Sequence, residues 1–118
     1  MFIKFDIVQF YPTITQKLLN DVIQFARSID GIVISEEDEK MIFHCRQSFL
    51  FCDGESWTKL GTENFNVPMG LYDGAEICEL VGLYLLHKLT SGKDAIFEKG
   101  KVGLYRDNGL SLIRLWIY

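Results

Sequence analysis

Residues 1–14 read MFIKFDIVQFYPTI, and this opening stretch decides the fold. Apolar and polar positions alternate over residues 1–7, and the apolar ones are good β-formers, so the stretch predicts a strand. Pro12 ends the extended run. Asp6 lies inside that strand between two large apolar residues, where a carboxylate is costly unless it is paired or binds a cation. The opening therefore predicts a strand that carries a candidate functional acid.

Three helices are predicted further along, over residues 15–28, 35–49 and 73–89. The first two begin at a threonine and a serine, which are favourable N-caps. Ser35 with Asp38 also resembles a capping box. The apolar residues that we expect to face the core are Leu18, Leu19, Val22, Ile23, Phe25, Met41, Ile42, Cys45, Phe49, Ile77, Leu80, Val81, Tyr84 and Leu85.

Two hairpins complete the expected elements. The Asp53-Gly54 pair is a strong hairpin signal, and it predicts a hairpin over residues 49–60. A second hairpin is expected over residues 102–117, with its turn at 107–109. The order strand, helix, helix, hairpin, helix, hairpin indicates an α+β fold. With 118 residues, we expect a single small domain over residues 1–118.

Composition limits the function. The chain has 12 basic and 16 acidic residues and a net charge of −4, which is not typical of a stand-alone nucleic-acid binder. Cys45, Cys52 and Cys78 form no CxxC pair, which argues against a disulfide framework and a zinc site, so we expect buried thiols in a reducing compartment. No signal peptide is visible, and the longest apolar stretch, Leu80–Leu86, is too short to span a bilayer. We expect a soluble, intracellular protein, in the nucleus or the cytoplasm.

Three stretches resemble the catalytic motifs of reverse transcriptases, in the same order. Residues 4–14 (KFDIVQFYPTI) resemble the first motif, in which a strand aspartate is followed five residues later by an aromatic residue. Residues 103–110 (GLYRDNGL) resemble the third, Tyr-any-Asp-Asp at the tip of a hairpin. Residues 67–70 (VPMG) resemble the second, a glycine-containing turn before a long helix, in a form similar to that of Penelope-like retroelement enzymes. The resemblance covers nearly the whole chain.

This resemblance implies an RNA-directed DNA polymerase palm domain. The implied fold is a palm-like antiparallel sheet packed on two or three helices, truncated so that the fingers and thumb are absent. The implied activity is templated nucleotidyl transfer with two Mg²⁺ (or Mn²⁺) ions, held by Asp6 and Asp107 with Asn108 beside them. The implied partners are a nucleic-acid template-primer and deoxynucleotides.

The resemblance also implies a nucleotide-binding set of Phe10, Tyr11, Met69 and Gly70. Tyr11 would be the steric gate that selects deoxynucleotides, and Gly70 would let the backbone approach the nucleotide closely. Each has a simpler interpretation: Tyr11 as a packed aromatic residue, Gly70 as a turn glycine and Met69 as core filler.

The chain departs from the family pattern at the third motif, where Asn108 replaces the second aspartate. Asparagine keeps an oxygen donor but loses a charge, so metal affinity should fall. The resemblance does not extend to the fingers and thumb, which carry most of the basic residues that bind template and primer. We therefore expect weak binding of nucleic acid. The alternative is therefore a catalytically impaired retroelement-derived fragment with no turnover, at most a protein-interaction module. Asp73 and Glu76 fit a helix start better than a metal site.

Overall fold

The computed structural model of the chain describes residues 1–47, 49–58, 60, 65, 67–68, 70–93 and 95–113. Helices and antiparallel sheets both occur, so the predicted α+β class is confirmed. The chain divides into two compact units, and unit 2 (Tyr11–Leu71) is inserted in sequence between the two segments of unit 1, Met1–Phe10 and Tyr72–Tyr118. The prediction of one small domain stays open.

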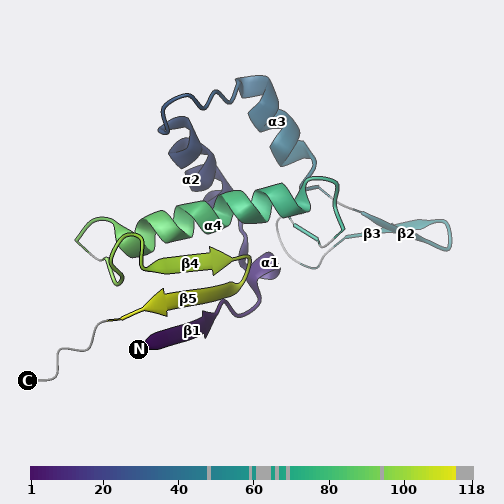
Figure 1. Cartoon of the computed structure of the whole chain (residues 1–118). Coiled ribbons are helices and arrows are strands. Elements are labelled where there is room, and N and C mark those ends of the chain that lie inside the picture. Colours follow the sequence, from purple (N-terminus) through teal and green to yellow (C-terminus); the bar gives the residue numbers. More distant parts are fainter. Residues whose placement is uncertain are drawn as a thin grey trace, which may run out of the picture. The chain divides into compact units, whose positions relative to one another are not determined.

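Unit 1 is built on a three-stranded antiparallel sheet with the strand order β1-β5-β4 (Figure 1). The strands are β1 Phe2–Asp6, β4 Val102–Tyr105 and β5 Asn108–Leu112. Because β5 is antiparallel to both neighbours, β1 and β4 run parallel to each other on either side of it. The helix α4, Gly74–Thr90, precedes β4, which gives a split β-α-β arrangement. The final strand of the unit thus lies beside its first.

The helix α4 packs on β4 through a close approach at Gly82. A Cβ atom added at Gly82 would lie 3.7 Å from Leu104 Cδ2, which is ordinary contact distance. From the predicted apolar stripe, Ile77 and Val81 are buried, and the other three positions are partly buried. Asp73 is the N-cap residue as predicted, but its side chain makes no capping hydrogen bond.

In the central strand of the sheet, a glycine is covered by an aromatic ring from the neighbouring strand. Phe5 and Gly109 are cross-strand partners, and a Cβ atom at Gly109 would overlap the Phe5 ring. The same ring stacks on Phe97, with centroids 5.7 Å apart and planes 9° from parallel. Gly109 is therefore a buried strand residue. The predicted turn at 107–109 is corrected by this packing, because the two turn residues are Arg106 and Asp107.

Unit 2 contains two capped helices. The helix α2, Gln16–Arg27, starts at Thr15, whose hydroxyl accepts a hydrogen bond from the Leu18 N–H at 3.1 Å. The helix α3, Glu36–His44, starts with the predicted capping box. Four α2 residues are buried: Leu19, Val22, Ile23 and Ala26. A single turn, α1 Phe10–Thr13, precedes α2 and had not been predicted.

Arg27 clasps the segment that connects α2 to α3. Its Nε donates to the Ile34 carbonyl at 3.1 Å, and its Nη2 donates to the Ser35 carbonyl at 3.4 Å. The same Nη2 is ion-paired with Glu39. Both ends of α3's first turn are thereby tied to the last turn of α2.

The Asp53-Gly54 hairpin is confirmed. The strands β2 Leu50–Cys52 and β3 Glu55–Trp57 pair in an antiparallel ladder. Asp53 has φ 52° and Gly54 has φ 80°, so both turn residues are left-handed, as a type I′ turn requires.

Two predictions about burial are wrong. The helix α3 ends at His44, well before Phe49, and none of its residues is buried; Met41, Cys45 and Phe49 are all exposed. Four acidic residues in its first turn suit a helix start but supply no apolar face. Cys45 and Cys52 are exposed and Cys78 is buried, so the expectation of buried thiols is wrong for two of the three.

Candidate functional site

The candidate site lies at the end of the unit 1 sheet where β1 ends and β5 begins. Asp6 is the last residue of β1, and its cross-strand partner is Asn108, the first residue of β5. Cross-strand partners in an antiparallel pair project from the same face. The side chains of Asp6 and Asn108 are therefore neighbours, and both are exposed to solvent.

Asp107 joins this pair from the turn. Its backbone carbonyl accepts a hydrogen bond from the Ile7 N–H at 2.7 Å, which ties the turn to the residue after Asp6. Its carboxylate Oδ1 accepts a hydrogen bond from Asn108 Nδ2 at 2.9 Å. Asn108 therefore has the Asp107 carboxylate before it in the turn and the Asp6 carboxylate across the ladder.

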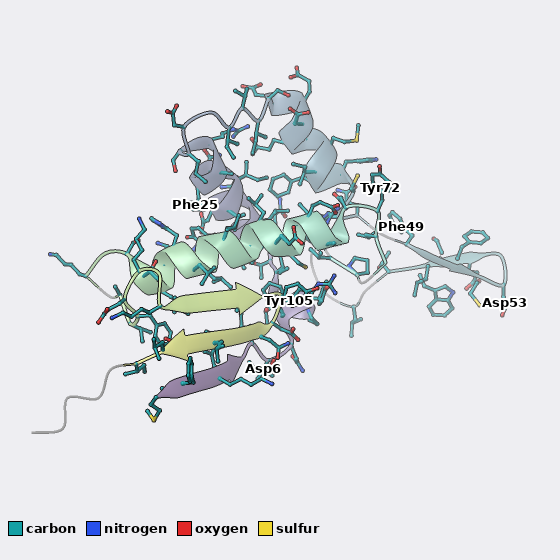
Figure 2. All side chains as sticks on the ribbon, in the orientation of Figure 1. Asp6, Phe25, Phe49, Asp53, Tyr72 and Tyr105 are labelled. Carbon is teal, nitrogen blue, oxygen red and sulfur yellow. The ribbon has the colours of Figure 1, made fainter. Side chains whose placement is uncertain are left out.

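The turn itself has an unusual backbone. Arg106 adopts φ 54°, which is in the left-handed backbone region that residues other than glycine, asparagine and aspartate rarely occupy. Its guanidinium lies over the Tyr105 ring, 5.5 Å from the centroid. Tyr105 is the second cross-strand partner of Asn108, so Asp6, Asn108 and Tyr105 form one row across the three strands. Figure 2 shows Asp6 and Tyr105 at the corresponding ends of β1 and β4.

The donor chemistry of Asp6, Asp107 and Asn108 suits a hard divalent cation. Two carboxylates and an amide oxygen are the oxygen ligands that Mg²⁺ prefers, and an exposed position leaves room for the waters that the ion keeps. Within the described ranges, no group of three or more His, Cys, Asp or Glu side chains could hold a metal ion. A site here would depend on Asn108 as its third donor, with only two negative charges from the protein.

The predicted nucleotide-binding residues are divided in sequence between the two units. Phe10 is 4% exposed, so its ring belongs to the core, and its predicted contact with a nucleotide stays a prediction. Tyr11 is half-buried in α1, and Gly70 has φ 93°, which only glycine adopts without strain. Met69 lies outside the described residues. Tyr11 and Gly70 belong to unit 2, so their predicted proximity to Asp6 stays a prediction.

Sequence reasoning missed two residues of the site. Tyr105 was taken only as part of a motif, yet the register places it in the same row as Asp6. Gly109 was assigned to the turn, whereas it is the position over which Phe5 lies. A glycine directly after the strand start, opposite an aromatic residue, could have indicated this packing.

Comparisons with known proteins return no match for this chain, whether it is compared with family models, with curated proteins or with solved structures. In the part of the chain that the structure describes, no helix has the length and hydrophobicity needed to cross a membrane.

Proposed function

We propose that the chain is a palm-like module of the reverse-transcriptase type, whose reaction is templated nucleotidyl transfer from deoxynucleotides. Asp6 and Asp107 are its metal-binding carboxylates, and Asn108 is the third oxygen donor. The observation that carries the proposal is the β1–β5 register, because it sets Asp6 opposite Asn108 and next to the Asp107 turn.

A chance resemblance to the two motifs would not require this register between the strands that carry them. Asp6 and Asp107 are about 100 residues apart in the chain, and loop closure alone favours no particular partner at that distance. A slip of one residue in the pairing would place a different residue opposite Asp6 and turn the Asn108 side chain to the other face. The two motifs were matched by sequence alone, and the strands that carry them are neighbours with the acids at the same end.

In this proposal each residue has a defined role. Asp6 and Asp107 bind divalent cations, which when bound would activate the primer hydroxyl and neutralise the triphosphate. Asn108 orients Asp107 through the 2.9 Å hydrogen bond between its amide and that carboxylate. Tyr11 excludes a 2′-hydroxyl, and Gly70 allows close approach of the nucleotide. The partners are template-primer and deoxynucleotides.

A second candidate function is favoured by one specific residue. Asn108 supplies no charge, so the site holds two carboxylates instead of the three that the family pattern implies. Since a divalent cation is held mainly by charge, weak metal binding and no turnover are the outcome if two are insufficient. The chain would then be a catalytically impaired retroelement-derived module.

Primer extension with native protein and the Asn108→Asp variant distinguishes these functions. We expect extension with Mg²⁺ or Mn²⁺ to rise at least tenfold in the variant, a change of about 1.4 kcal/mol in the barrier. Asp6→Asn within the Asn108→Asp background is the matched control, because it restores the native charge while removing the strand acid. Equal inactivity of native and Asn108→Asp protein would exclude polymerase activity for this chain alone.

Metal binding gives a readout that does not depend on activity. We expect Mn²⁺ to broaden the NMR amide signals of Asp6, Asp107 and Asn108 selectively, and Asn108→Asp to tighten Mn²⁺ binding about tenfold. Glu76→Gln, on α4, removes an acid from the same unit without touching the row and should change nothing. Broadening spread evenly over the surface acids would contradict the assignment of the site.

A further inference from the structure

The β2–β3 hairpin (residues 49–57) exposes large apolar side chains on both of its faces. The exposed fractions are 63% for Phe49, 76% for Leu50, 77% for Phe51 and 57% for Trp57. The register places Leu50 and Trp57 on one face and Phe51 with Ser56 on the other. Figure 2 shows Phe49 at the base of the hairpin and Asp53 at its tip. Neither face is covered within the described residues.

Such a hairpin needs further contacts to be stable. An isolated two-stranded sheet is marginal in water, and its stability comes from additional strands or from a packed face. The type I′ turn sets the twist and register but buries no apolar surface. A cluster of exposed aromatic and aliphatic side chains of this kind marks an interaction surface.

The backbone indicates which edge is available. In a two-residue hairpin the closing pair, here Cys52 and Glu55, points its polar groups inward across the ladder. The next pair, Phe51 and Ser56, therefore points its N–H and C=O outward. Among the described residues no further strand pairs with β2, so Phe51 is the centre of an unpaired edge.

The β2 edge lacks the features that block association. Leu50–Cys52 contains no charge and no proline, whereas β3 begins with Glu55. Natural edge strands are protected by charges, prolines or bulges. Of the two strands of the hairpin, β2 is therefore the one whose edge can accept an incoming strand.

We propose that β2 pairs with β2 of a second copy of this chain, antiparallel and about a twofold axis at Phe51. The two Phe51 residues then exchange both backbone hydrogen bonds, and Leu50 faces the partner's Cys52. The product is a four-stranded sheet with the order β3-β2-β2-β3. This self-complementary pairing is the isologous contact that a twofold dimer requires.

Two copies meet along β2 without charge repulsion, because Leu50–Cys52 is uncharged, and the acidic tips favour the antiparallel orientation. Asp53 and Glu55 make the tip of each hairpin acidic, and an antiparallel pairing places the two tips at opposite ends of the new sheet. A parallel pairing would bring them together. Residues 49–57 contain no lysine or arginine, so single-stranded nucleic acid, which needs basic side chains beside its stacking aromatics, fits this surface poorly.

The apolar area that the pairing can bury determines how strongly two copies associate. With aromatic side chains of about 150–250 Å² each, the exposed fractions correspond to roughly 500 Å² of apolar surface per copy. Pairing at the β2 edge covers only the part of this surface next to the seam, so it buries less than roughly 1,000 Å² from both copies. Stable specific interfaces bury about 1,200–2,000 Å² in total, so the pairing predicts a weak dimer. Association should therefore depend on protein concentration.

Sedimentation of the full chain tests the pairing. We expect the native mass to rise from 13.6 kDa towards twice that value with concentration. Phe51→Lys and Phe51→Glu should each weaken association at least tenfold, because like charges meet at the axis. An equimolar mixture of the two variants should restore it. Ser56→Lys, the same face on the other edge, is the matched control and should associate like the native chain.

Disulfide trapping tests the register independently. In a Cys45→Ser background, Leu50→Cys should form a covalent dimer with the partner's Cys52 on mild oxidation, since non-hydrogen-bonded partners lie at disulfide distance. Further replacement of Cys52 by serine should abolish it. A native chain that remains monomeric at millimolar concentration, or charge variants whose mixture does not associate, would overturn the proposal and leave the hairpin to a different protein.

Discussion

The Phe5 ring that lies over Gly109 makes a sharp prediction for Gly109→Ala. A Cβ atom at this position would overlap three ring atoms, of which the most distant, Cε1, would be only 2.5 Å away. Carbon atoms pack at about 3.5–4.0 Å, so the ring or β5 must move by about 1 Å or more. The ring cannot move without disturbing its stack on Phe97.

The magnitude follows from three contributions. Overpacking of this kind costs about 1–3 kcal/mol, and loss of the aromatic stack costs about 0.5–1.5 kcal/mol. Replacing glycine by alanine in a strand returns about 0.5–1 kcal/mol. We expect Gly109→Ala to lower the free energy of unfolding by about 1–3 kcal/mol, a large part of the stability of a chain this small.

Urea denaturation followed by circular dichroism measures this difference. Gly103→Ala is the matched control, because Gly103 lies in the neighbouring strand β4 with nothing within 4 Å of an added Cβ. We expect Gly103→Ala to be neutral or to stabilise by up to about 1 kcal/mol. In a double-mutant cycle, Gly109→Ala should cost little in a Phe5→Ala background. Equal effects at Gly109 and Gly103, or an unchanged cost without the Phe5 ring, would refute the reasoning.

Three further changes test the helix ends and the α2–α3 connection. Ser35→Ala removes the hydroxyl and disturbs the backbone hydrogen bond that lower the pKa of Asp38, so an NMR titration should find that pKa raised towards its ordinary value. Because the native pKa of Asp38 is lowered, the capping box should stabilise α3 at pH values above the ordinary carboxyl range, and this stabilisation should be lost as the pH falls through the lowered pKa. Hydrogen-exchange protection in α3 that stays constant over this pH range would contradict the prediction. Thr15→Ala should lower the free energy of unfolding by about 1 kcal/mol through loss of the α2 N-cap, whereas the exposed Thr58→Ala should not. Arg27→Gln should speed hydrogen exchange over residues 29–35 through loss of the clasp, with Lys17→Gln on the same helix as the unaffected control.

Local sequence signals correctly predicted the elements that are marked by alternation, capping residues or turn residues. The alternation before Asp6, the N-cap at Thr15, the Ser35–Asp38 capping box and the Asp53-Gly54 turn all lie where the sequence placed them. Each depends on contacts within a few residues. The adjacency of β1 and β5 was also expected, but only because two separate motifs implied it.

The errors share a physical cause. Periodicity shows which residues could share a helix face, but not whether another element covers that face, so Met41 and Phe49 were wrongly expected to be buried. The turn after Tyr105 was misplaced because Asn-Gly is a favourable turn pair, and the Phe5 ring that requires Gly109 in the strand comes from the other end of the chain. Long-range packing overrode local turn preference there.

The strand order of unit 1 also has a consequence for biosynthesis. Among the described residues β1 pairs with β5, which is translated roughly 100 residues later, and at about 5–20 residues per second this is a delay of about 5–20 s. During that interval an apolar segment that includes Ile3 and Phe5 has no ladder to join. A nascent chain of this topology is therefore a candidate client for chaperones that hold hydrophobic segments, and slowing translation should increase the capture.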